Sequence, residues 1–261
     1  MDDVTGNVGV ASARLTPAGA LDARARALPP VARVRDALRF VLRPVFVARP
    51  MAWGWQSAAS LLVLLALSLI ACLLVHVVLE AINSRAAFLP VRTEPPVISP
   101  ADLIAPVLFA PVLEEVLFRS WLSGRVAALR FLVYVVVAVA ILIANYVVTK
   151  GEGSWLGIVV IAVVLLGLLH WGLTRKRDAA VPAWFAAQFH WIVWGSTLLF
   201  GLVHLGNHAV PTNPLGILVV LPQTLGGLLL AYTRTRLGFL AAVVHHSAFN
   251  AVWFGAGLIF G

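Results

Sequence analysis

The chain carries little charge. Only 11% of its 261 residues are Asp, Glu, Lys or Arg, whereas a soluble domain has about 25%. Hydrophobic residues make up 61% of the chain, and the mean hydropathy is +0.95. These values exclude an ordinary soluble domain, and long continuous apolar runs exclude a transmembrane β-barrel. The sequence therefore predicts an all-α protein, a polytopic bundle of transmembrane helices.

Cysteine is nearly absent too. Because Cys72 stands alone, neither a disulfide within the chain nor a cysteine-based metal site can form. Cys72 lies in an apolar run, and we interpret it as a packing residue. The sequence also has no Gly-rich phosphate loop, no Cys/His finger, no heptad pattern and no convincing internal repeat. Nothing in it marks a second folded domain.

Seven apolar segments are near the roughly 20 residues that cross a hydrocarbon layer of about 30 Å. Their approximate limits are 57–81, 101–124, 130–149, 154–174, 188–207, 214–233 and 237–260. Pro and Gly cluster in the connections between them. The connection 83–100 is long, and we expect that it includes an interfacial helix.

Basic residues are distributed unevenly. Eight arginines lie between Arg14 and Arg49, and alternate loops contain Arg125, Arg130, Arg175, Lys176, Arg177, Arg234 and Arg236. The other loops contain only Arg85, Arg92 and Lys150. Because cytoplasmic loops carry the excess of Lys and Arg, this pattern predicts a multi-pass protein of the inner (cytoplasmic) membrane with a cytoplasmic N-terminus and an external C-terminus.

Residues 1–50 form a basic N-terminal arm, and residues 51–261 form the transmembrane domain. We interpret the arm as a cytoplasmic segment that faces anionic lipid, not as a nucleic-acid-binding segment. Its first 30 residues are rich in Ala, Pro and Gly and are predicted to be disordered. They also lack the apolar core of a signal peptide.

Ionisable residues recur inside three of the predicted spans, although each costs about 2.5–3.5 kcal/mol to insert. In the second span, Glu115 and Arg119 are four residues apart and share a helix face, so they can form an ion pair. Glu114 lies about 100° around the helix from Glu115. One carboxylate would then be structural and the other free to act as a base. The alternative that all three residues form one structural network stays open.

The fifth and seventh spans supply histidines. Phe200 and His204 share a face, as do His246 and Asn250, and an imidazole beside an amide is suited to polarising an oxygen. His204 lies about 16 residues into its span, while Glu114 and His246 lie near mid-membrane. We expect the motifs to converge, so either the fifth span begins later or a helix is tilted or broken. The other histidines are interpreted as structural: His76, His170, His190, His208 and His245.

These three motifs together resemble those of the CPBP intramembrane proteases, which include CAAX prenyl endopeptidases and bacteriocin-processing (Abi) proteins. That family carries Glu-Glu-x-x-x-Arg, Phe-x-x-x-His and His-x-x-x-Asn (or Asp) in this order, each on a transmembrane helix. Here they are Glu114 to Arg119, Phe200 to His204 and His246 to Asn250. The resemblance covers roughly residues 100–255.

The resemblance implies an intramembrane endopeptidase that hydrolyses a peptide or membrane-protein substrate within the lipid bilayer. Glu114 would be the base that activates a water, supported by Glu115 and Arg119. His204 would orient the water or act as an acid, and His246 and Asn250 would stabilise the oxyanion. Whether a metal takes part stays open, and Glu114, His204 and His246 are the candidate zinc ligands. We favour a metal-free reaction.

Two other functions are weighed against a protease. A catalytically silent scaffold, or a maturation or immunity protein of the same family, has no need of every motif residue, yet all are present. A transporter often shows repeats and paired broken helices, and neither is recognisable here. Nothing in the chain selects a substrate, but its Arg- and Ala-rich usage indicates a GC-rich bacterial genome and disfavours CAAX prenyl processing.

Overall fold

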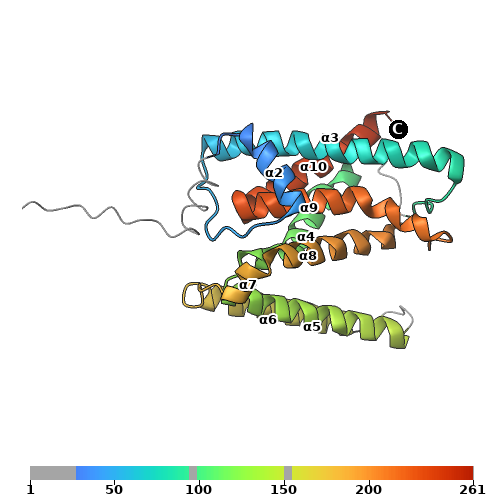
Figure 1. Cartoon of the computed structure of the whole chain (residues 1–261). Coiled ribbons are helices and arrows are strands. Elements are labelled where there is room, and N and C mark those ends of the chain that lie inside the picture. The colour runs from blue at the N-terminus through green and yellow to red at the C-terminus, as the bar shows by residue number, and fades with distance from the viewer. Residues whose placement is uncertain (1–27, 94–98, 150–154, 261) are drawn as a thin grey trace, which may run out of the picture.

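The computed structural model describes residues 28–93, 99–149 and 155–260, which are almost entirely helical (Figure 1). The elements are α2 (Ala32–Leu42), α3 (Trp55–Ala86), η1 (Pro100–Leu103), η2 (Ala105–Phe109), α4 (Ala110–Phe118), η3 (Ser120–Ser123), α5 (Val126–Thr149), α6 (Leu156–Thr174), α7 (Ala183–Ala187), α8 (Phe189–Val203), η4 (His204–Asn207), η5 (Pro214–Val220), α9 (Leu221–Arg236) and α10 (Phe239–Phe260). Of the η elements, η2 is a π turn and the others are 3₁₀ helices. The predicted all-α class is confirmed.

Six helical segments are long and apolar enough to cross a membrane: α3, α5, α6, α8 with η4, η5 with α9, and α10. They correspond to six of the seven predicted spans, and the fold of about seven apolar segments is confirmed. The interfacial helix expected within 83–100 is not found in the described part of that connection, because α3 continues to Ala86 and residues 87–93 form no helix. Residues 94–98 lie outside the described residues. The cytoplasmic position of the N-terminus stays a prediction.

The remaining predicted span, 101–124, is divided into η1, η2, α4 and η3. Proline is the physical reason. Pro111 has no N–H, so it cannot donate to a carbonyl of the preceding turn, and the Ala110 N–H instead donates across a π turn to the Ala105 carbonyl. Pro106 and Pro111 fall in this span, and Pro100 directly precedes it. The α-helix that carries Glu114 and Glu115 is therefore short, with nine residues in α4.

The basic arm contains a helix that the sequence did not predict. In α2, Arg33, Ala37 and Phe40 are buried against α3 and α9. The Arg33 Nε donates to Ser60 Oγ (2.7 Å), and Asp36 Oδ2 accepts from the Tyr232 hydroxyl (2.9 Å). These tertiary bonds fix a segment whose composition alone resembles a solvated arm. The disorder predicted for residues 1–30 falls mostly on residues 1–27, outside the described part of the chain.

Helix α9 is the centre of the bundle. Its residues from Gly227 to Thr233 are all buried, and it packs against α3, α8 and α10. Helices α5 and α6 form a separate antiparallel pair beside this group (Figure 1). Their close approach requires Gly167, where a Cβ would lie 2.7 Å from the Tyr134 Cβ. Since α9 is held on several sides, it is a rigid support for the helices that carry the motifs.

Candidate active site

The first motif separates its two carboxylates. Glu115 is fully buried and forms an ion pair of 2.5 Å with Arg119 Nη1, as the i,i+4 spacing predicted. The Arg119 guanidinium also lies over the Phe200 ring, 4.0 Å from its centroid, which is a cation–π geometry. Gly227 leaves room for this stack, because a Cβ there would lie 3.0 Å from the Phe200 ring. Glu115 is therefore held by structure and has no access to solvent.

Glu114 points elsewhere. Its side chain retains 26% of its exposure and lines a cavity of about 1390 Å³. Within the described residues its Oε2 has no hydrogen-bond partner, although His246 Nε2 lies 3.6 Å away. A buried carboxylate oxygen without a partner is costly, and a water in the cavity would satisfy it. Glu114 is thus the carboxylate that can meet a water.

His246 lies between the two carboxylates. Its Nδ1 is 3.0 Å from Glu115 Oε1, and its Nε2 faces Glu114. Because a carboxylate only accepts, Nδ1 carries the proton of the shorter bond. The ring also contacts Phe200 edge-on, with centroids 6.1 Å apart. The first and third motifs therefore meet directly.

His204 joins the same group through Phe200. Helix α8 ends at Val203, and His204 is the first residue of η4. Its Nδ1 donates to the Phe200 carbonyl (2.7 Å), which leaves Nε2 as an acceptor, and the residue lines the cavity. Glu114, His204 and His246 line one cavity, so the three motifs converge. The fifth span begins at Phe189, one residue from its predicted start, and it is the second span that is broken.

Asn250 also lines the cavity but makes a bond that the sequence did not indicate. Its Nδ2 donates to the Pro106 carbonyl (2.7 Å). The amide has a second N–H and an oxygen, so it keeps one donor for a ligand. Asn250 therefore links α10 to the broken second span.

Two nearby histidines fill different places. His245 is buried between Ser68 Oγ (3.0 Å) and Thr233 Oγ1 (2.9 Å). It ties α3, α9 and α10 together, which agrees with its structural interpretation. His208 lies at the far rim of the cavity, in the isolated bridge with Arg92.

Two of the three candidate zinc ligands lie side by side. His246 Nε2 is 3.6 Å from Glu114 Oε2, and His246 Nδ1 donates to Glu115 Oε1 (3.0 Å), as a metal-bound histidine often does to a carboxylate. The third candidate, His204, lines the same cavity. Within the described residues, no group of three His, Cys, Asp or Glu is already arranged to hold a metal.

Residues 96–252 match the family described as Type II CAAX prenyl endopeptidase Rce1-like. The match covers more than half of the chain. The chain belongs to the Rce1-like family. The matched range nearly coincides with residues 100–255, over which the sequence resembles the CPBP proteases. The predicted resemblance is confirmed. No curated protein and no solved structure shows a significant match.

Membership of the Rce1-like family, together with the six membrane-spanning helices, makes this chain a multi-pass membrane protein of an endopeptidase family.

The structure adds one residue to the site that the sequence interpretation treated only as a loop charge. Arg234 donates from Nε to the Arg119 carbonyl and from Nη2 to the Ser120 carbonyl, both at 3.0 Å. It thereby caps the end of α4, whose last carbonyls have no partners within the helix. In the sequence, the feature that could have indicated this role of Arg234 is its position directly after the apolar run of α9.

Proposed function

We propose that this chain is an intramembrane endopeptidase that hydrolyses a peptide bond with a water activated by Glu114, without a metal. The observation that carries this proposal is the division between the two carboxylates. Glu115 is committed to Arg119 and His246, whereas Glu114 faces the cavity with an unpartnered oxygen. The sequence motif alone does not choose between adjacent glutamates.

The reaction begins with the water. Glu114 accepts one of its protons, and the free Nε2 of His204 accepts a hydrogen bond from the other. General bases in such positions contribute typically 10²–10⁴-fold to the rate. The remaining hydroxide adds to the peptide carbonyl carbon and keeps its own hydrogen. Glu114 then gives its proton to the peptide nitrogen as the C–N bond breaks, which releases an amine and a carboxylic acid.

The oxyanion of the tetrahedral intermediate forms within reach of Asn250 and His246. Asn250 has one N–H left after its bond to Pro106, and His246 Nε2 faces the cavity beside Glu114. In this role the His246 ring carries protons on both nitrogens, with Nδ1 donating to Glu115. Donors of this kind are worth about 10²–10³ in kcat. Glu115 and Arg119 are positioning residues, because Glu115 contacts His246 and Arg119 holds Glu115.

Peptide cleavage by the purified protein in lipid nanodiscs tests the proposal. Wild type, Glu114→Gln and the control His190→Gln are compared on a quenched-peptide library, with and without a zinc chelator. We expect wild type and His190→Gln to cleave equally, Glu114→Gln to lose about 10²–10⁴-fold, and the chelator to have no effect. Equal cleavage by Glu114→Gln would contradict the assignment of the base. Complete inactivity of wild type on every peptide would favour a catalytically silent scaffold instead.

A further inference from the structure

The cavity that contains Glu114 and His246 extends to one end of the bundle. Beyond these residues it is lined by the second halves of α3 and α10, by η1 and η2, by residues 89–92 and 207–208, and by the start of α9. Backbone bonds join these connections, from the Thr93 N–H to Asn207 O (2.9 Å) and from the Ala209 N–H to Val91 O (2.8 Å). We call this the cavity end, defined by residues 87–93 and 207–213.

The opposite end is closed. Residues 28–67, 115–199 and 231–244 contribute nothing to the described lining of the cavity. There the interior is filled by buried side chains that include Phe40, Leu64, Tyr232 and Leu237. The connections of this end are joined by bonds from the Met51 N–H to Arg236 O (2.7 Å) and from the Val126 N–H to Ala180 O (3.0 Å). We call it the basic end, defined by residues 43–54, 124–126, 175–182 and 236–238.

The two ends differ strongly in charge. The described basic residues at or near the basic end are Arg33, Arg35, Arg39, Arg43, Arg49, Arg125, Arg130, Arg175, Lys176, Arg177, Arg234 and Arg236. The cavity end has Arg85 and Arg92 in its described part. Since the membrane side with the excess of Lys and Arg is cytoplasmic, this charge difference predicts that the basic end is the cytoplasmic one. The cavity would then open on the other side.

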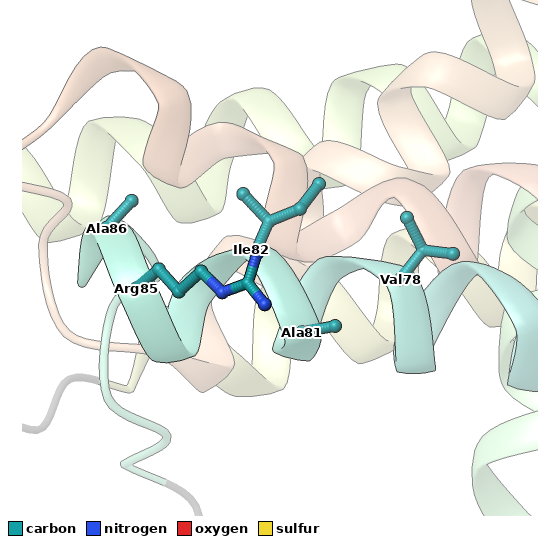
Figure 2. Close-up of a pocket in the computed structure, with 5 residues that line it drawn as sticks. All are labelled: Val78, Ala81, Ile82, Arg85 and Ala86. Atoms are coloured by element: carbon teal, nitrogen blue, oxygen red, sulfur yellow. The ribbon is translucent and has the colours of Figure 1, made fainter.

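A second, shallower hollow of about 380 Å³ does not offer another route. Figure 2 shows it on α3, lined by Val78, Ala81, Ile82, Arg85 and Ala86. At 100° per residue, this group lies mostly on the face of α3 away from Ser68, Cys72 and Leu79, which line the large cavity. Its apolar surface with the Arg85 stem laid along it is typical of a lipid-facing helix end.

We propose that the active site receives its substrate from the external side of the membrane, and that the substrate is an external segment of an exported or membrane-anchored polypeptide. That the bound polypeptide is a substrate rests on the proposed function. The side of the membrane from which it enters does not depend on that function. The cavity wall fits an apolar stretch of peptide, since Phe249 and Trp253 stack in parallel along α10, 5.7 Å apart. A C-terminus presented in the cytoplasm would meet the closed end.

Cysteine accessibility tests the side of access directly. In a Cys72→Ala background, which has no other cysteine, single cysteines are introduced as Asp102→Cys at the cavity rim, Thr212→Cys at the cavity end and Lys176→Cys at the basic end, all exposed positions. Spheroplasts of a bacterial expression host are treated with a membrane-impermeant maleimide. We expect the first two to be labelled in intact spheroplasts and Lys176→Cys only after permeabilisation. The reverse pattern would overturn the proposal.

A second measurement separates this inference from the proposed function. Spheroplasts that contain wild type or Glu114→Gln receive a quenched peptide that does not cross the membrane. We expect at least tenfold faster cleavage by wild type. External labelling of Asp102→Cys without external cleavage would count against the protease while leaving the side of access supported. Cleavage only in inverted vesicles would overturn the side of access while supporting the protease.

Discussion

The side-chain amide of Asn250 donates a 2.7 Å hydrogen bond to the backbone carbonyl of Pro106. That carbonyl lacks a helical partner, because the Ala110 N–H is committed to the Ala105 carbonyl and Pro111 has no N–H to give. Asn250 therefore supplies the donor that the backbone of the π turn lacks. π turns of this kind occur frequently at functional sites, and this one directly precedes the helix that carries Glu114.

Asn250→Ala should destabilise the protein by about 1–3 kcal/mol, because the half-buried Pro106 carbonyl loses its donor. In a Pro111→Ala background the new N–H can reach that carbonyl, so the same substitution should cost less stability there. Thermal unfolding of the four proteins in detergent measures both costs. An equal loss in the two backgrounds would show that Asn250 does not compensate for Pro111.

The two glutamates should separate activity from stability. Glu114→Gln should slow cleavage by about 10²–10⁴-fold while changing the unfolding temperature little, because Glu114 Oε2 has no hydrogen-bond partner within the described residues and lies as far as 3.6 Å from His246. Glu115→Gln should cost about 3–5 kcal/mol, since it leaves Arg119 buried without its counter-charge. The double variant Glu115→Gln/Arg119→Met should recover part of that stability. Destabilisation of similar size by both single glutamine substitutions would argue that the carboxylates form one structural network.

The sequence predicted the class of fold, the approximate limits of six spans and the four motif residues that line the cavity, Glu114, His204, His246 and Asn250. It could do so because hydropathy and i,i+4 spacing are local properties. The break of the second span was not predicted, since the effect of Pro106 and Pro111 depends on Asn250, 144 residues away from Pro106. Helix α2 was missed for the same reason: its order depends on Ser60 and Tyr232.

Arg234 should be needed for the position of the first motif. It donates to two carbonyls at the end of α4, and charged hydrogen bonds contribute about 1.5–3 kcal/mol each. Arg234→Ala should therefore lower both stability and kcat. Arg234→Lys keeps the charge but cannot form the forked contact, so it should recover only part of either. Unfolding temperature and kcat of the two variants check this, and full recovery by Lys would reduce the role of Arg234 to its charge.

The α5–α6 pair should respond to acid through Asp178. Arg130 Nη1 donates to Asp178 Oδ2 (2.9 Å), and this bond, with a second from Arg177, holds the pKa of Asp178 below its ordinary value of 3.8. A carboxylate with a lowered pKa contributes stability above its unfolded-state pKa and loses that contribution as the pH falls toward its folded-state pKa. Asp178→Asn should therefore lower the unfolding temperature more at pH 7 than at pH 3. A difference between wild type and Asp178→Asn that is the same at both pH values would show that the link to Arg130 does not stabilise the pair.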